Sequence, residues 1–359
     1  MRHELGVIGY GNMGSWHCEN VRDRIENLNV RLVYDIDEKR RALAREKGFA
    51  VCDTEEEFFN SDVDLILVAT PNSFHKEHCI KAMMHGKNVI SEKPACLNCE
   101  ELEEVLAVSQ RQGKLYTVHQ NRRFDTDYAL IKEIVKSDVL GKQFYLNSRL
   151  YGNRGFSNAG WKSVYEAGGG LLYDWGIHLI DQVLCLYEHD KPISVYAELH
   201  NVRMEHVDDV CRVTIEFESG LKAQIVADLW CYVPEARWHL EGSDGSAVIE
   251  KWFGTEGKII RAKNQDISWE TGCIYTPNGM STSMWPRAAH DLEEVDLPIP
   301  EKLPRWEDFY ENVLDAIEGR AAQMVTREQI RKDMKVMMAA FESARTNTVV
   351  KLYDEKGMK

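Results

Sequence analysis

Short apolar runs alternate with helix-like patterns along the first third of the chain, which predicts strands and helices in alternation. The predicted strands cover 5–9, 30–35, 65–69, 88–91 and 115–119, and the predicted helices cover 15–24, 38–47, 74–85 and 98–112. Asn98 and Glu101 form a candidate capping box for the last of these helices. Strands that alternate with helices favour a parallel sheet with right-handed crossovers.

The pattern changes after about residue 123. A helix is predicted at 128–136, a strand at 144–150 and a helix at 171–186. From 194 to about 263, strand-like runs follow one another with glycine-containing turns between them, which favours a mostly antiparallel sheet. Residues 264–304 show weak periodicity and are expected to form a long loop.

The end of the chain is predicted to be largely helical. Apolar side chains over 306–317 have the spacing of an amphipathic helix that packs on a core. Thr326 and Gln329 form a second candidate capping box, which opens a helix to about residue 346. A closing strand is expected at 349–353.

The length of 359 residues favours two domains, because one domain usually holds ~150 residues. The expected fold class is α/β. Residues 1–122 are expected to form a doubly wound parallel sheet, and residues 123–359 a second α/β domain with a large, mostly antiparallel sheet. The 44% apolar and 28% charged residues are typical of a soluble globular protein.

Charge and apolar run length exclude two classes of partner. The chain has 44 basic and 58 acidic residues, and a net charge of −14 disfavours binding to nucleic acid. Its longest apolar runs fall far short of the ~20 residues that cross a bilayer, so no membrane is expected. Nine scattered cysteines and a start without a signal pattern favour free thiols and a cytoplasmic location.

A glycine-rich segment, Gly9-Tyr10-Gly11-Asn12-Met13-Gly14, follows the first predicted strand and opens the first predicted helix. Gly9 permits a tight turn, Gly11 lets the backbone approach a pyrophosphate, and Gly14 lets the helix pack closely. The helix start then offers unpaired N–H groups to the phosphates. In this context the segment predicts a dinucleotide-binding site.

Asp35 supports this interpretation. It lies 21 positions after Gly14, at the end of the second predicted strand, where a carboxylate binds the hydroxyl groups of the adenosine ribose. A carboxylate there repels a 2′-phosphate, so we predict NAD as the cofactor in preference to NADP. Arg40 and Arg41 leave the NADP alternative open.

Two further segments carry candidate chemistry. Lys93, in Ser91-Glu92-Lys93-Pro94, ends a predicted strand at the sheet edge where ligands bind, although it also fits a surface turn. Asp174 and His178 are four residues apart in a predicted helix, which suits either a general base with its carboxylate or a helix-stabilising pair. The glycines at 168–170 are interpreted as room for a ligand at this helix start.

Together these segments resemble the family named after glucose–fructose oxidoreductase and inositol dehydrogenase (Gfo/Idh/MocA). The resemblance rests on the order and spacing of six elements up to about residue 185. They are GYGNMG, the acid Asp35, ATPN with His75, SEKP, HQNRRF at 119–124 and GGGLLYDWGIHLID at 168–181.

The resemblance implies a Rossmann domain, a second domain used for substrate binding and oligomerisation, and roles for named residues. It implies that Lys93, Asp174 and His178 are the catalytic residues and also bind the substrate. Further residues are implied to bind the cofactor, and these are Gly9, Gly11, Asn12, Met13, Gly14, Asp35, Thr70, Pro71, Asn72, His75, Glu92, Lys93 and Asn121. Arg122, Trp161 and Lys162 are implied substrate contacts, although many relatives have Trp-Arg where this chain has Trp161-Lys162.

The sequence therefore predicts an NAD-dependent oxidoreductase that acts on a secondary hydroxyl of a sugar, cyclitol or glycoside, with C3 of a glucosyl group as the favoured position. One alternative is an enzyme that recycles bound NAD, so that the net reaction is elimination, hydrolysis or transhydrogenation. Another is a non-catalytic NAD-binding regulator. The expected partners are the small substrate and further copies of the chain.

Two patterns are not interpreted as metal sites, and no metal is expected. Cys96 and Cys99 form a CxxC without a second pair, whereas zinc sites need four ligands. His75 and His78 form an HxxH that also lacks further ligands.

Overall fold

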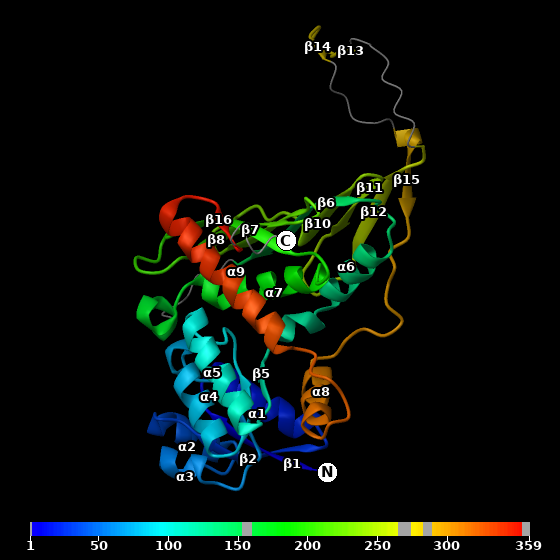
Figure 1. Ribbon diagram of the computed structural model, residues 1–359. Coiled ribbons are helices and arrows are strands. Elements are labelled where there is room, and N and C mark those ends of the chain that lie inside the picture. The colour runs from blue at the N-terminus through cyan, green and yellow to red at the C-terminus, as the bar shows by residue number, and fades with distance from the viewer. Residues whose placement is uncertain (1, 153–159, 265–273, 283–288, 354–359) are drawn as a thin grey trace.

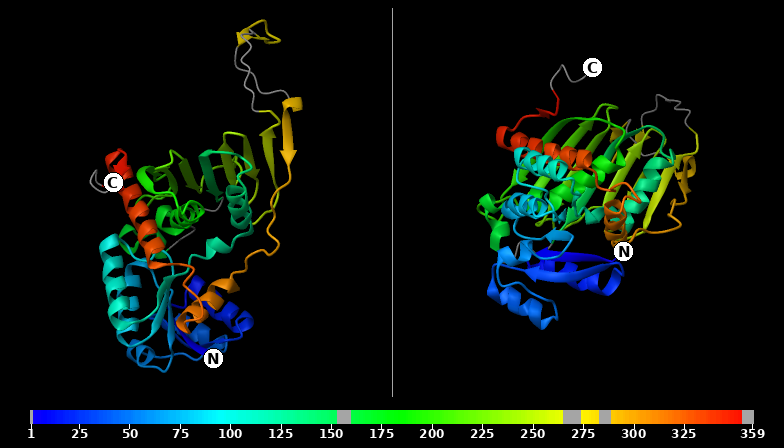
Figure 2. Two further views of the ribbon diagram at one scale, coloured as in Figure 1. Left: turned by 45° about the vertical axis from the view of Figure 1, so that its right-hand side comes forward. Right: turned by 60° about the horizontal axis from the view of Figure 1, so that its bottom comes forward.

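The computed structural model describes residues 2–152, 160–264, 274–282 and 289–353. Two sheets dominate it, one in each half of the chain (Figure 1). The strands of the first half form the smaller sheet, and the helices of that half pack around it (Figures 1 and 2). The larger sheet lies beyond them and has helices on one of its faces. No helix in the described ranges is long and apolar enough to cross a membrane.

The first sheet confirms the predicted parallel arrangement. Its five strands follow the order β2-β1-β3-β4-β5, and every neighbouring pair is parallel. The strands are β1 (His3–Ile8), β2 (Leu28–Tyr34), β3 (Leu65–Val68), β4 (Asn88–Ser91) and β5 (Tyr116–Val118). The helices are α1 (Asn12–Arg24), α2 (Glu38–Glu46), α3 (Glu55–Phe59), α4 (His75–Met84) and α5 (Cys99–Gln112). β3 is fully buried, as its unbroken apolar run requires in a sheet covered on both faces.

The second sheet has nine strands in the order β15-β12-β11-β10-β6-β9-β8-β7-β16. Among these described strands only the β6–β9 pair is parallel, so the prediction of a large, mostly antiparallel sheet is confirmed. The strands are β6 (Gln143–Tyr151), β7 (Pro192–His200), β8 (Val210–Phe217), β9 (Lys222–Asp228), β10 (Trp238–Gly242), β11 (Gly245–Ile249), β12 (Gly257–Ala262), β15 (Leu292–Val295) and β16 (Val350–Lys351). The helices of this half are α6 (Thr126–Lys136), α7 (Ile177–Leu186), α8 (Glu307–Ile317) and α9 (Arg327–Thr346).

The two predicted capping boxes have different outcomes. Thr326 and Gln329 make both hydrogen bonds of a capping box at the start of α9, as predicted. At α5, Asn98 accepts from the backbone N–H of Glu101, but the Glu101 carboxylate accepts from Leu97 N instead of Asn98 N. The capping box predicted at Asn98 and Glu101 is therefore only half correct, while the predicted helix start is confirmed.

The prediction of one long loop over 264–304 is wrong where β15 pairs with β12. A short hairpin of β13 (Ile274–Tyr275) and β14 (Ser281–Thr282) also lies in this range. The rest of the predicted loop at 265–273 and 283–288 lies outside the described residues. Weak periodicity concealed β15 because two of its four residues, Glu293 and Glu294, are exposed acids on an edge strand.

The chain returns to the first sheet near its end. The Tyr310 hydroxyl of α8 bonds to His17 Nδ1 of α1, at 2.6 Å, and Arg24 pairs with Glu307. In Figures 1 and 2, α8 lies beside the first sheet, while α9 lies across the helical face of the second. The boundary at 122/123 stays a prediction, and α8 is a segment beyond it that packs on the first half.

The face of the second sheet that points away from the helices carries polar side chains. Buried apolar residues alternate along the strands and meet the helices, as Val213 and Ile225 do. The opposite face pairs Tyr196 with Thr214, and Thr214 with Gln224. Period-2 alternation therefore places polar residues on the outward face of this sheet.

Candidate active site

The turn after β1 has the geometry that a bound pyrophosphate needs. Gly9 has φ +93°, and a Cβ there would lie 2.6 Å from the Ala69 carbonyl oxygen. A Cβ at Gly14 would lie 1.8 Å from the Gly9 carbonyl oxygen, so only glycine allows this close packing. Gly11 has open space above it, since no described atom lies within 4 Å of the place that a Cβ would take. The described residues thus leave a cradle that fits NAD, and Asn12 and Met13 are exposed at the start of α1 above it.

Asp35 is held next to this turn by backbone groups. Its carboxylate accepts from Tyr10 N at 2.6 Å and from Asp37 N at 2.8 Å. Arg41 does not approach this carboxylate, because its Nη1 donates to the carbonyl oxygens of Asp35 and Ile36. Nη1 of Arg41 is thereby engaged by the backbone, which favours the ribose-binding role of Asp35 over capture of a 2′-phosphate by this nitrogen.

We expect Asp35→Ser to weaken NAD binding by about 10- to 100-fold, the usual loss for hydrogen bonds to a charged group. Binding of NADP should fall less or rise, because the repulsive carboxylate is gone. Titration of both cofactors against the wild type and the variant would measure the two ratios. Asp23→Ser, which removes an exposed acid on α1, is the control. Tighter binding of NADP than of NAD by the wild type would contradict the predicted preference.

Lys93 reaches from the end of β4 to the second half of the chain. Its Nζ donates to both Oδ1 and the backbone oxygen of Asp174, each at 2.7 Å. Lys162 Nζ donates to the other carboxylate oxygen, Oδ2, at 2.9 Å. Burial alone would raise the pKa of Asp174, but the charges and hydrogen bonds of the two lysines outweigh burial and lower it well below its usual range. Asp174 is therefore ionised, and it joins segments that are far apart in the sequence.

His178 lies beside this group and is buried. Burial, followed by the positive charges of Lys93 and Arg122, lowers its pKa well below the usual value. Its Nδ1 is buried and has no hydrogen-bond partner among the described residues. The imidazole is thus neutral at neutral pH and able to accept a proton. A helix-stabilising pair with Asp174 is not formed, because both oxygens of that carboxylate bond to lysines.

A π-helical segment, Leu172–Gly176, places Asp174 just before α7. The helix start is set by Asp208, whose carboxylate accepts from Leu172 N at 2.7 Å. A Cβ at Gly170 would lie 2.2 Å from Asp208 Oδ1, and one at Gly169 would lie 2.4 Å from the Lys162 carbonyl oxygen. The interpretation of these glycines as room for a ligand is therefore wrong, because the protein's own groups fill that space.

Glu92 anchors a second buried cluster directly before Lys93. Its Oε1 bonds to His17 Nε2 at 2.7 Å and to His119 Nδ1 at 3.0 Å. Burial would raise the pKa of Glu92, but the hydrogen bonds from His119 and His17 outweigh burial and hold that pKa well below its usual range. Burial and the neighbouring His119 lower the pKa of His17 to about 4. These side chains are of metal-binding types, yet their contacts are hydrogen bonds that keep Glu92 ionised and fixed.

Asn72 and His75, two further residues from the resemblance, hold the segments next to Lys93 and Asp174. Asn72 Nδ2 donates to the Gly168 carbonyl oxygen at 2.8 Å, which ties the end of β3 to the segment before Asp174. The two ring nitrogens of His75 contact the carbonyl oxygens of Pro94 and Thr70. His75 is buried, and its bond to the Pro94 carbonyl oxygen supports the Lys93–Pro94 turn from the protein interior.

The remaining predicted site residues have few contacts with Lys93, Asp174 or His178. Thr70 Oγ1 bonds to His78, and Lys162 Nζ lies 5.9 Å from the centre of the Trp161 ring. Pro71 and Asn121 are half-buried. Cys96 and Cys99, like every other cysteine in the described ranges, are free thiols.

A narrow recess beside His178 contains residues that sequence analysis did not identify. His178, Arg122 and Trp252 line it together with Asp125, Leu150, Trp175, Leu179, Gln182 and Arg237. Trp252 Nε1 donates to Asp125 Oδ2 at 2.9 Å, a contact between residues 127 positions apart. Arg237 is buried and pairs with Asp127 at 3.1 Å. Contacts between residues so far apart leave no local pattern in the sequence. Of the residues that line the recess, only His178 and Arg122 were predicted from the sequence.

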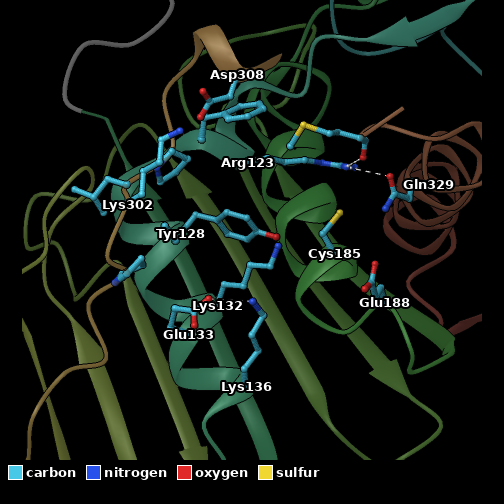
Figure 3. Close-up of a pocket in the computed structure, with 16 residues that line it drawn as sticks. Arg123, Tyr128, Lys132, Glu133, Lys136, Cys185, Glu188, Lys302, Asp308 and Gln329 are labelled. Atoms are coloured by element: carbon cyan, nitrogen blue, oxygen red, sulfur yellow. Dashed lines mark hydrogen bonds and ion pairs between the residues drawn. The ribbon is translucent and has the colours of Figure 1, made fainter. Parts of the chain in front are cut away.

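A cavity of about 470 Å³ lies elsewhere, among α6, α7 and the segment before α8 (Figure 3). Its charged lining mixes lysines with acids, as the labelled Lys132, Lys136, Glu133 and Glu188 show. The predicted catalytic and cofactor residues do not line this cavity. Arg123, at its edge, bonds to Gln329 and to Asp181 and so belongs to the packing of α7 against α9.

Two family models match this chain. Residues 3–120 match the oxidoreductase family with an NAD-binding Rossmann fold, and residues 128–248 match the GFO/IDH/MocA C-terminal domain. A solved NAD-binding protein from Listeria innocua is 33% identical, with a TM-score of 0.86, and the alignment covers 98% of this chain and 97% of that one.

Two relatives from Bacillus subtilis are named by their reactions. A scyllo-inositol 2-dehydrogenase (NADP(+)) is 26% identical over 97% of this chain and 96% of its own length. A scyllo-inositol 2-dehydrogenase (NAD(+)) is 28% identical over 73% of this chain and 79% of its own length. The two relatives differ in the cofactor that their names give.

Proposed function

Because this chain belongs to the Gfo/Idh/MocA family of NAD-binding oxidoreductases, we propose that it oxidises a secondary hydroxyl of a sugar, cyclitol or glycoside, with C3 of a glucosyl group as the favoured position. The observation that carries the proposal is the convergence of Lys93 from the first half of the chain with Asp174 and His178 from the second. Relatives named as inositol dehydrogenases support a polyhydroxylated ring as substrate.

The chemical roles follow from the charge of each group. NAD, when bound, supplies the hydride acceptor. Neutral His178 accepts the proton of the reacting hydroxyl as general base. The Lys93 ammonium stabilises the negative charge that develops on that oxygen. Asp174 holds Lys93 in place through two contacts, and beside its two lysine partners its carboxylate keeps lone pairs that can accept a substrate hydroxyl.

The most direct test has two parts. Purified protein is denatured, released NAD(H) is measured, and native protein is then screened with NAD against sugars, cyclitols and glycosides for NADH formation. Net NADH from a polyhydroxylated ring is the expected result. Tightly bound NAD without net NADH would favour an elimination, hydrolysis or transhydrogenation with recycled cofactor. NAD binding without turnover of any compound would favour a regulator.

We also propose a homo-oligomer built on the faces of the second sheet. Its uncovered face is polar but continuous over many strands, and side chains such as Tyr145 and Gln224 bond to each other across it. Surfaces of mixed polarity also form stable interfaces. Light scattering at micromolar concentration should give a mass at least twice 41.3 kDa. A mass of one chain would contradict the proposal.

A further inference from the structure

Two aromatic side chains that line the recess with His178, Trp175 and Trp252, continue to a third, Phe253, outside it. The Trp175 ring centre lies 5.6 Å from that of His178, and Trp252 lies 5.2 Å from Trp175 at an angle of 90°. Phe253 stacks on Trp252, with ring centres 4.3 Å apart and planes 21° apart. We call Trp175, Trp252 and Phe253 the aromatic platform. Trp175 is the ring next to His178, and Trp252 and Phe253 lie beyond it.

Phe253 is held in a costly position. It is 52% exposed, and its backbone has φ +59°, a left-handed conformation that is unfavourable for a bulky residue. Two side chains hold it there, because Asp127 Oδ1 accepts from Phe253 N at 3.0 Å and Thr126 Oγ1 donates to its carbonyl oxygen at 2.6 Å. Strained residues concentrate at functional sites, where the surrounding structure fixes them. Burial in the core does not explain this one, since half of its surface faces solvent.

Arg122 connects the aromatic platform to the recess. Its guanidinium carbon lies 5.1 Å from the Trp175 ring centre, 4.8 Å from Trp252 and 5.5 Å from Phe253. Such cation–π contacts fix the three rings relative to one another. Arg122 Nε is buried and has no hydrogen-bond partner among the described residues, so a donor remains for a ligand hydroxyl.

We infer that the aromatic platform binds a second ring of the substrate, beyond the ring that is oxidised, and that the preferred substrate is a glycoside. The inference rests on the proposed function. A flat sugar face presents C–H groups that pack on an aromatic ring, and the sugar hydroxyls can pair with Arg122 at its edge. Binding of a remote ring can also favour the reaction at the first ring by fixing its orientation.

The test compares substrates with one and two rings. Turnover with NAD is measured for myo-inositol, methyl α- and β-D-glucoside, maltose and cellobiose, in wild type, Phe253→Ala, Phe253→Tyr and Phe144→Ala. Binding of the same compounds to the NADH-bound protein is measured by calorimetry. Phe144 is also an exposed aromatic, at 46%, on β6, so Phe144→Ala is the matched control. Light scattering reports whether a variant changes the assembly.

For the wild type, at least one disaccharide should have a kcat/KM about fivefold or more above that of its methyl glucoside, the gain expected from one aromatic contact. Phe253→Ala should reduce that ratio to near one, while Phe253→Tyr and Phe144→Ala keep it. Three results would overturn the inference but leave the proposed function standing. They are equal kcat/KM for substrates with one and two rings, turnover of myo-inositol alone, and a Phe253→Ala variant that changes the mass of the assembly but not the ratio of kcat/KM values. Absence of turnover and binding for all compounds would overturn both.

Discussion

Replacing His178 by alanine should lower turnover by roughly 100- to 10,000-fold, the usual contribution of a positioned general base. The buried imidazole has a pKa well below its ordinary value, so it is in its proton-accepting form at neutral pH. Cofactor binding should change little, because the glycine turn and Asp35 lie in a different part of the chain. Steady-state kinetics and NAD titration on the same preparation would separate the two effects.

The pH dependence of kcat/KM tests the protonation state of His178 independently. A base with a depressed pKa keeps its proton-accepting form as the pH falls, so kcat/KM should stay flat through about 6.5, the pKa of an ordinary histidine. His189→Ala, which removes an exposed histidine just after α7, is the control and should behave as the wild type. Wild-type turnover in His178→Ala would leave Lys93 or a bound water as the proton acceptor.

The parts of the site that local sequence determines were predictable. Glycine is needed at 9 and 14 for local reasons, which are the positive φ of Gly9 and the close approach of Gly14 to the Gly9 carbonyl oxygen. Lys93 was placed at the correct sheet edge because a strand and a proline bracket it within a few residues. In each case the physical constraint acts between neighbours in the chain, so the spacing of residues reveals it.

Distant contacts decide the rest, and the sequence pattern does not report them. Asp208 sets the start of the π-helical segment from 36 positions away, and the glycines at 169 and 170 make room for it and for the Lys162 backbone. Sequence analysis recognised these glycines but assigned their space to a ligand. The histidines that bond to Glu92 come from α1 and from the end of β5, and each alone is an ordinary buried residue.

Lys93→Ala should abolish most activity while NAD binding stays mostly intact. The variant loses the ammonium that we propose to stabilise the developing charge, and Asp174 keeps only the second of its two lysine contacts, the one from Lys162. Removing the Lys93 charge should also raise the pKa of His178, since that charge helps to lower it. The acid limb of any residual kcat/KM profile should therefore move to higher pH. Lys76→Ala, which removes an exposed lysine of α4, is the control.

The double variant Lys93→Ala/His178→Ala shows whether the two residues act together. Each single change disables the same step, so the combined loss should be far smaller than the product of the single losses. Thermal unfolding of all variants checks that the fold persists, because Lys93→Ala weakens the charge balance of buried Asp174. Losses that multiply would show that Lys93 and His178 contribute independently. Lys93 would then serve mainly to hold Asp174 at the junction of the two halves, and its assignment as a catalytic residue would be wrong.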